Sequence, residues 1–473
     1  MNKSRGIRGI IWVALALMLV WTLFACKEEG FPQESTGTDA DSTTCEFGGE
    51  TDSAPISEES VEEDTTEGDS QGGNDSVEEE TTEGDRTTAE NETTTVGGAT
   101  EEDTTEEEIT REDLFGLDIP EGEYSLTFEN LNVLGSGHNV VVFVIDRFDW
   151  EYYEGARGIA PEIFYNLDNG GFTYFNDSIS LYPRTFPSIA YMVTGVKNDF
   201  SMSRNDYFQA AYGGSEFMRA LYNAGYDINI YTDSYYGYTN AAFMANYAQN
   251  AKNNQEGYAA CSTDMKQIYS CITDNGMTVG EGKKSYKLIH LSGTHLPLAY
   301  DENFNPLPSG DPNKSNPTIG LRTSFAIINH YIDEMKRLGV YENSTIIITG
   351  DHPSIGSDSA VPLRWAHVTP LFVKPSSRSS GELRISEAPV THEDLFATVL
   401  KSEGFGNYAS FGRSVFDVPE TEKRDRLYYF QKLDTVDGVT NYEMVTFRIR
   451  GKAGDYANWE IIDRHYIGGS IYK

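Results

Sequence analysis

Four residues with metal-binding or nucleophilic side chains follow apolar or proline-rich segments at three separate places in the chain. Asp146 ends one apolar run, and Asp351 with His352 ends another. Thr185 lies between two prolines, where a bent segment enters a helix-like run. Carboxylate oxygens and an imidazole nitrogen suit Mn²⁺ or Zn²⁺, and a hydroxyl held beside such a metal becomes a nucleophile. The set therefore predicts one metal site with Thr185 as its nucleophile.

Each of these residues has a simpler explanation when it is taken alone. A threonine at the entry to a helix commonly caps it, an aspartate at a strand end usually caps a turn, and an Asp-His pair is more often structural. The convergence of all four at one edge of a sheet favours the metal site instead. A helix N-terminus behind Thr185 would also stabilise negative charge on its hydroxyl and on an incoming phosphoryl group.

The segments around these residues alternate between strand and helix patterns. Continuous apolar runs are typical of strands buried in a parallel sheet, and the runs between them are typical of helices. This alternation predicts an α/β fold with a mostly parallel central sheet, in which ligands bind beyond the carboxyl ends of the strands. The C-terminal residues predict a small antiparallel extension. The expected strands are 139–146, 226–233, 286–293, 344–351 and 366–375, and the expected helices are 158–168, 215–226, 317–338 and 392–404.

The N-terminal quarter of the chain differs in composition from the rest. Residues 1–26 have a basic start, an apolar run and Cys26 in the box LFAC, which predicts a bacterial lipoprotein signal peptide with Cys26 as the lipid anchor. An uncleaved transmembrane anchor is the alternative, and either places the remainder outside the cytoplasm. Residues 27–112 hold 30 acidic and three basic residues and are predicted to be a disordered linker. Residues 113–473 are the predicted catalytic domain.

The cysteines and the acidic residues exclude some other kinds of site. Cys261 and Cys271 lie ten residues apart in a domain that is expected to be exported. The sequence therefore allows either a disulfide between them or two free thiols. The chain has no CxxC and no Cys/His zinc ribbon. The acidic linker lacks the spacing of an EF-hand, so no calcium loop is expected there.

Taken in order, the motifs resemble those of the alkaline phosphatase superfamily, in its sulfatase-like branch. The segment PRTFPS resembles the nucleophile segment of nucleotide pyrophosphatase/phosphodiesterases. LIHLSGTHLPL resembles the segment before a substrate-site histidine of lipoteichoic acid synthases and phosphoethanolamine transferases, and TGDHP is similar to their Asp-His metal pair. The resemblance spans about 137–417 and implies a three-layer sandwich around the sheet. It also implies that Asp146, Thr185, Asp351 and His352 bind one divalent metal, Mn²⁺ or Zn²⁺.

Further site residues follow from the same resemblance. His295 and His367 fall where the transferases keep histidines near the phosphate or the leaving group, and either could be the general acid. A solvent-facing histidine at the start of a strand is the alternative for His367. Arg184 could assist in binding substrate, whereas His290 and His330 are expected to be structural. A full second metal site is not expected, because the segment after His295 lacks an Asp-x-x-x-His pair.

Thr185 also decides between the branches that the resemblance allows. Sulfatases mature a Cys or Ser in a C/S-x-P-x-R frame to formylglycine, whereas here Thr185 stands first and Ile189 replaces the arginine. Because threonine cannot become formylglycine, the sequence predicts phosphoryl transfer. In the implied two-step reaction, Thr185 attacks phosphorus and a water, sugar or lipid hydroxyl then releases the phospho-threonine ester. The alternatives are a sulfatase-like hydrolase that uses unmodified threonine and an inactive surface-binding lipoprotein.

The same reasoning predicts where the protein acts. A lipid anchor at Cys26 would hold it on the outer face of the bacterial cell membrane. A phosphorylated lipid or cell-wall polymer, with phosphoglycerol or a similar head group, is the expected substrate, and no nucleic-acid partner is expected. Lipoteichoic acid synthases carry several transmembrane helices, whereas this chain has one apolar segment. A polymerase proper is therefore not expected.

Overall fold

The structure is a computed structural model that describes residues 122–233, 238–254, 260–354, 368–436 and 439–466. Three of the sequence predictions lie outside these residues. They are the signal peptide with Cys26, the acidic linker with its boundaries at 26/27 and 112/113, and the placement of His367.

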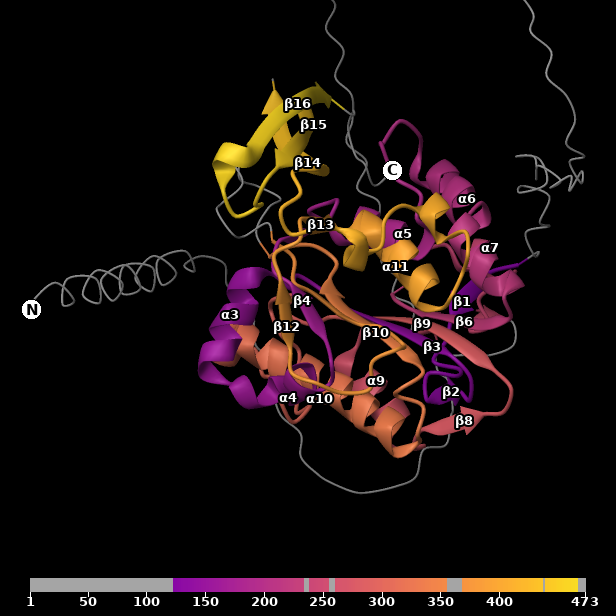
Figure 1. Cartoon of the computed structure of the whole chain (residues 1–473). Helices are drawn as coiled ribbons and strands as arrows, with labels where there is room; N and C mark the ends of the chain where they lie inside the picture. The colour runs from indigo at the N-terminus through magenta and orange to yellow at the C-terminus, as the bar shows by residue number, and fades with distance from the viewer. Residues whose placement is uncertain (1–121, 234–237, 255–259, 355–367, 437–438, 467–473) are drawn as a thin grey trace, which may run out of the picture. The chain divides into compact units, whose positions relative to one another are not determined.

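The core of the described residues is a seven-stranded mixed sheet (Figure 1). All neighbouring strands run parallel except where β11 pairs antiparallel with the strands on both sides of it. The prediction of an α/β fold with a mostly parallel central sheet is therefore confirmed. In spatial order the strands are β12 (Arg384–Ser386), β4 (Thr173–Phe175), β11 (Leu371–Lys374), β10 (Ser344–Gly350), β3 (Asn139–Ile145), β9 (Lys284–Leu291) and β6 (Tyr226–Tyr231).

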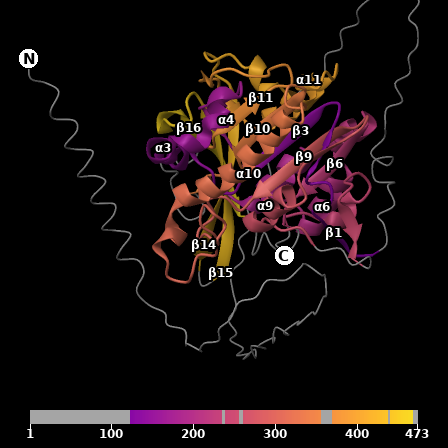
Figure 2. The same ribbon diagram turned by 90° about the horizontal axis from the view of Figure 1, so that it is seen from below.

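Helices cover both faces of this sheet, which makes the three layers of the expected sandwich (Figures 1 and 2). The three central strands are buried along nearly their whole length, so they need apolar residues on both faces, which explains why their sequences do not alternate. On one face lie α3 (Trp150–Ile159), α4 (Tyr165–Asn169), α9 (Met265–Thr273) and α10 (Pro317–Arg337), and on the other lie α5 (Thr185–Thr194), α6 (Arg204–Gly213), α7 (Glu216–Asn223) and α11 (Leu395–Ser402).

One predicted helix is confirmed only in part. The sequence pattern predicted a helix over 158–168, whereas α3 begins at Trp150 and a second helical segment follows it. Asp149 caps α3, because its carboxylate accepts a hydrogen bond from the backbone N–H of Tyr152 at 2.9 Å. Pro161 then ends the helix, since proline has no N–H to continue the α-helical ladder, and a 3₁₀ turn leads into α4.

Two glycines let the loops approach the ends of the central strands. Gly293 follows β9 with φ 52°, and a Cβ there would lie 2.4 Å from Ile145 Cγ2. At Gly350, the last residue of β10, a Cβ would lie 2.4 Å from the carbonyl oxygen of Phe148. Both positions therefore hold the carboxyl-end loops close to Asp146 and Asp351, which follow β3 and β10.

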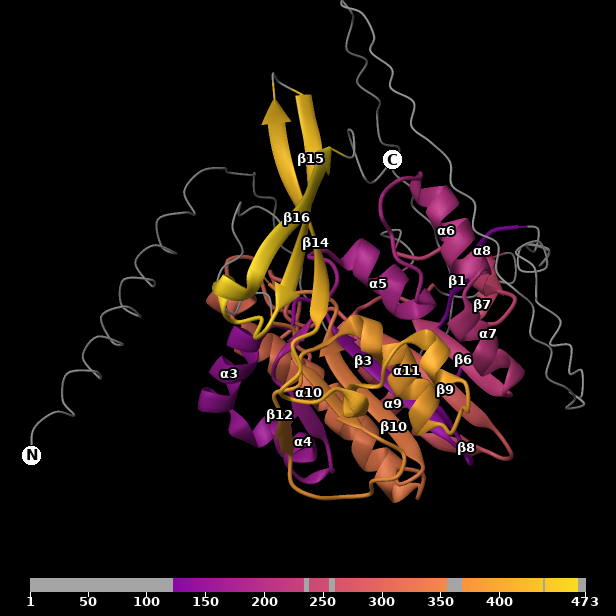
Figure 3. The same ribbon diagram turned by 45° about the horizontal axis from the view of Figure 1, so that its top comes forward.

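The predicted C-terminal antiparallel extension is present as a three-stranded sheet (Figure 3). It is tied to the central part of the chain by a buried ion pair between Arg426 and Asp177, whose nearest atoms are 3.1 Å apart. Tyr429 donates its backbone N–H to the carbonyl of Leu181 at 2.8 Å, and its ring stacks on Tyr182 with the centroids 5.5 Å apart. The strands are β14 (Asp425–Val436), β15 (Val439–Arg450) and β16 (Trp459–Tyr466).

Cys261 and Cys271 are separate free thiols in the structure, Cys261 buried and Cys271 half-buried. Of the two alternatives that the sequence left open, the structure therefore has the free thiols. Within the described ranges, no helix has the length and the hydropathy that crossing a membrane requires.

His392 makes the stability of this fold sensitive to acid. Its side chain is buried, and burial lowers its pKa to about 3. An unfolded histidine titrates near pH 6.5, so between these values only the unfolded chain takes up the proton and stability falls as the pH falls. The contribution of His392 is a slope of up to about 1.4 kcal/mol per pH unit. In denaturant unfolding at several pH values, the free energy of unfolding of the His392→Gln variant should fall less steeply with falling pH than that of the wild type. An equally steep fall in both proteins would contradict this role of His392.

Candidate metal centre and nucleophile

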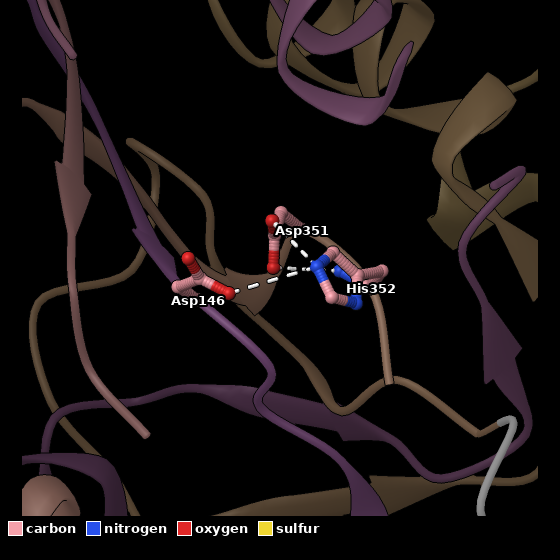
Figure 4. A group of neighbouring side chains, drawn as sticks. All are labelled: Asp146, Asp351 and His352. Atoms are coloured by element: carbon pink, nitrogen blue, oxygen red, sulfur yellow. Dashed lines mark hydrogen bonds and ion pairs between the residues drawn. The ribbon is translucent and has the colours of Figure 1, made fainter. Parts of the chain in front are cut away.

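Parallel pairing of β3 with β10 places the predicted carboxylates side by side. Ile145 pairs with Gly350 in the register, so Asp146 and Asp351 are the next residues on adjacent strands. Together with His352 they form a buried group whose ligand atoms all lie within 4.8 Å of one another (Figure 4). Within the described part of the chain, no other group of three such side chains lies this close. The structure thus brings together three of the four predicted metal ligands.

The two carboxyl groups carry an electrostatic cost in this position. Burial raises the pKa of Asp146 well above its usual value, and the neighbouring charge of Asp351 raises it further. Burial also raises the pKa of Asp351, although His290 and two backbone N–H groups oppose the rise. Those N–H groups belong to Arg147 and His352, which donate to Asp351 Oδ1 at 3.0 and 2.8 Å. A nearby positive charge would relieve this repulsion.

The orientation of His352 fits a cation at the same place. Its Nδ1 lies 2.8 Å from the carbonyl oxygen of Pro353, so Nδ1 carries the hydrogen and Nε2 keeps its lone pair. Burial lowers the pKa of His352 to about 3, which keeps the ring neutral. Nε2 lies 3.6 Å from Asp146 Oδ1 and 3.3 Å from Asp351 Oδ2, and neither oxygen has a hydrogen-bond partner among the described residues. A lone pair facing two carboxylate oxygens is repulsive without a cation between them, so these residues fit a divalent metal.

Thr185 lies at the start of α5 with its hydroxyl directed into this group. Its Oγ1 is 3.1 Å from His352 Nε2, and it also lies within hydrogen-bonding reach of Asp351 and Tyr238. The helix begins at Thr185 itself, and Arg184 is the N-cap residue without a side-chain capping bond. The structure therefore gives no capping role to the Thr185 hydroxyl. The positive end of the helix dipole lies at this hydroxyl instead.

The other predicted site residues lie around the same centre. His295 is exposed and lines a pocket of about 470 Å³ together with Asp146 and Tyr238. Partial removal from solvent lowers the pKa of His295, and the positive charge of Arg147 lowers it further. Arg184 is half-buried, and its Nε has no hydrogen-bond partner among the described residues. The placement of the remaining predicted residue, His367, lies outside the described residues.

Three further residues of this centre were not predicted as site residues. Beside the effect of burial, Arg147 lowers the pKa of Asp146 and His290 lowers that of Asp351, whereas both carboxylates raise the pKa of Tyr238. His290 was expected to be structural; its Nδ1 lies 3.0 Å from the Thr232 hydroxyl, whereas its buried Nε2 has no hydrogen-bond partner among the described residues. Tyr238 comes soon after β6, so its position beyond the carboxyl end of a strand was the available sequence signal.

Asp149 connects the two segments that carry the candidate ligands. One of its oxygens caps α3, and the other accepts hydrogen bonds from the backbone N–H of Ser354 at 3.0 Å and from the Ser354 hydroxyl. Burial raises the pKa of Asp149 to about 6. Because Ser354 follows His352 by two residues, Asp149 holds the His352 segment against the end of β3.

Solved structures of known proteins are similar to this chain at low sequence identity. No curated protein sequence matches the chain. It is similar in structure to an alkaline phosphatase superfamily protein from Vibrio parahaemolyticus, with 12% identity, a TM-score of 0.46 and coverage of 72% of this chain and 84% of the other. The lipoteichoic acid synthase LtaP from Listeria monocytogenes is also similar, with 13% identity, a TM-score of 0.45 and coverage of 72% of this chain and 89% of the other. The phosphonate monoester hydrolase SpPMH from Silicibacter pomeroyi is similar with 16% identity, a TM-score of 0.45 and coverage of 67% of this chain and 87% of the other.

The sequence model of the sulfatase family matches residues 138–404, which is more than half of the chain. The matched segment contains Asp146, Thr185, His295, Asp351 and His352. The resemblance inferred from the motifs is confirmed, and the chain belongs to the sulfatase family.

Proposed function

We propose that this member of the sulfatase family is a metal-dependent phosphotransferase or phosphodiesterase that uses Thr185 as its nucleophile. The observation that carries the proposal is the position of the Thr185 hydroxyl, 3.1 Å from His352 Nε2 and at the N-terminus of α5. A threonine cannot be matured to formylglycine, which favours phosphate over sulfate as the group transferred. Asp146, Asp351 and His352 would hold the metal together with Thr185.

The residues of the chain divide the reaction into two steps. Thr185 Oγ1, after losing its proton to solvent, attacks phosphorus in line, the bond to the leaving oxygen breaks, and a phospho-threonine ester forms. His295 gives its proton to the leaving oxygen. In the second step it takes a proton from the water, sugar or lipid hydroxyl that attacks the ester, and the bond from phosphorus to Thr185 Oγ1 breaks. A divalent cation, Mn²⁺ or Zn²⁺, would lower the pKa of the hydroxyl and offset negative charge on the oxygens. The lowered pKa of His295 in the free protein favours its role as the base, and an anionic substrate would raise that pKa for its role as the acid.

The substrate and the location are proposed from the sequence. A lipid anchor at Cys26 and the acidic linker would present the catalytic domain at the outer face of the bacterial cell membrane. A phosphorylated lipid or cell-wall polymer with a phosphoglycerol-like head group is the substrate that fits such a location. Membership of the sulfatase family supports a second candidate, a sulfuric ester hydrolase that uses unmodified threonine.

A comparison of two reporter esters separates these candidates. The full chain, freed of metal by a chelator and then supplied with Mn²⁺ or Zn²⁺, should hydrolyse bis(4-nitrophenyl) phosphate and leave 4-nitrophenyl sulfate nearly untouched. The reason is that Thr185 and the metal stabilise phosphoryl transfer, whereas sulfate hydrolysis in this family depends on an aldehyde that threonine cannot form. Release of nitrophenol is measured with and without metal. Faster turnover of the sulfate would favour the second candidate, and no turnover of either ester would contradict the proposal.

A further inference from the structure

Asp149 carries a buried charge that its capping role does not explain. Its side chain is 1% exposed, and no lysine or arginine among the described residues offsets its charge. Burial disfavours the charged form of such a carboxyl, so its position costs free energy. An asparagine caps a helix as well as an aspartate does, and it has no charge to bury. A carboxylate at this position therefore points to a second role.

The second oxygen of the carboxylate, Oδ2, accepts both hydrogen-bond donors of Ser354. The backbone N–H of Ser354 donates to it at 3.0 Å, and the Ser354 hydroxyl donates to it as well. Oδ1 accepts the backbone N–H of Tyr152 at 2.9 Å in the first turn of α3. Because an asparagine has only one acceptor oxygen, it could not make both sets of bonds. The carboxylate is thus suited to joining α3 to the segment that follows His352.

The peptide group between Pro353 and Ser354 links Asp149 to His352. Its N–H donates to Asp149, and its C=O, which belongs to Pro353, lies 2.8 Å from His352 Nδ1. Hydrogen bonds in such a chain polarise one another, so the carboxylate makes the Pro353 carbonyl a stronger acceptor. A strong acceptor on Nδ1–H fixes the tautomer of a histidine ring and raises the basicity of its Nε2, which makes Nε2 a better metal ligand.

We propose that Asp149 is a positioning residue, which sets the tautomer and the orientation of His352 through the Pro353–Ser354 peptide group. Carboxylates that orient a metal-binding histidine commonly accept its N–H directly, whereas here one peptide group stands between the two side chains. The inference rests on the proposed function in so far as His352 binds a metal. The hydrogen bonds that carry it involve neither Thr185 nor the substrate.

Two variants of Asp149 separate this role from the helix cap. Asparagine and serine both cap helices, but each has a single oxygen and cannot serve α3 and Ser354 together. In calorimetry, the full chain with Asp149→Asn or Asp149→Ser should bind Zn²⁺ with a Kd about ten- to a hundredfold higher than that of the wild type. In the metal-free chain with ¹⁵N-labelled histidine, NMR should show the Nδ1–H tautomer of His352 in the wild type and a mixture of tautomers in both variants. The His352 signal is identified by its loss in His352→Gln.

A weaker variant and a control complete the test. Ser354→Ala keeps the peptide N–H and loses only the hydroxyl bond, so its Kd for Zn²⁺ should rise about two- to tenfold. Asp311→Asn changes an aspartate that caps the short helical segment Pro312–Ser315 outside the centre, and it should leave both measurements unchanged. The proposal is overturned if both Asp149 variants bind Zn²⁺ within about twofold of the wild type, or if both keep the single tautomer.

Failure of the proposed function is seen separately from failure of this inference. A wild type that binds no Zn²⁺ contradicts the metal site, whereas the tautomer of His352 in the metal-free chain still decides whether Asp149 orients the ring. Full turnover in a Thr185→Ala variant contradicts the nucleophile and changes neither measurement on Asp149.

Discussion

Replacing Thr185 with alanine should lower the turnover of bis(4-nitrophenyl) phosphate by about a thousandfold or more, the range measured when a catalytic nucleophile is removed. The reason is that no other hydroxyl among the described residues lies against His352 Nε2 as Thr185 does. The fold should be little affected, with a change in stability within about 1 kcal/mol, because the Thr185 side chain makes no capping bond to α5. Turnover is measured at saturating metal, and stability by denaturant unfolding.

Two comparisons make this result specific. Thr185→Ser keeps a hydroxyl at the same atom and should retain a substantial part of the activity. Ser203→Ala removes a serine that caps α6, a helix whose described residues include none of the candidate centre, so it should cost stability but not turnover. If Thr185→Ala turns over at the wild-type rate, the nucleophile is another group and the two-step reaction through Thr185 is wrong.

Replacing Asp351 with asparagine should have opposite effects on the metal-free and the metal-supplied protein. Without metal, the carboxyl is buried beside Asp146 and its pKa is raised, so at about pH 7 its charge destabilises the folded chain. Asparagine removes that charge and should therefore raise the Tm of the metal-free chain. With Zn²⁺ or Mn²⁺ present, the wild type should gain stability by binding the ion, and the variant should not.

Thermal unfolding with and without metal, together with metal analysis of the purified full chain, checks these opposite effects on stability. Asp168→Asn is the control, because that half-buried carboxylate pairs with Arg157 far from the ligands in sequence and forms no part of the centre. It should leave the metal content and the metal-dependent shift in Tm unchanged. The absence of a divalent ion from the wild type, or an equal metal content in Asp351→Asn, would contradict the metal site.

The sequence predicted the parts of the centre that depend on single strands. Asp146 and Asp351 could be placed because each directly follows an unbroken apolar run, and runs of that kind are buried parallel strands whose carboxyl ends meet. Thr185 could be placed because its prolines mark a bend before a helix. In each case, local residue chemistry and one topological rule were enough.

The remaining parts depend on tertiary geometry that local patterns do not carry. Arg147 has a left-handed backbone conformation in the turn whose N–H bonds Asp351, and no sequence rule predicts that turn at an arginine. Tyr238 reaches Thr185 from a loop after β6, an edge strand, and its distance from Thr185 in the sequence hides the contact. The start of α3 was missed because the capping role of Asp149 was not considered.

The contacts of Tyr429 bear on when the candidate centre can be completed during synthesis of the chain. The chain emerges from its N-terminus, so every candidate ligand and Thr185 are made before β14. Yet Tyr429, in β14, holds Leu181 and stacks on Tyr182, only a few residues before Thr185. A growing chain that already contains the whole centre therefore lacks the strand that supports its nucleophile segment. The candidate centre is completed only when one of the last-made strands folds back onto residues made some 250 positions earlier.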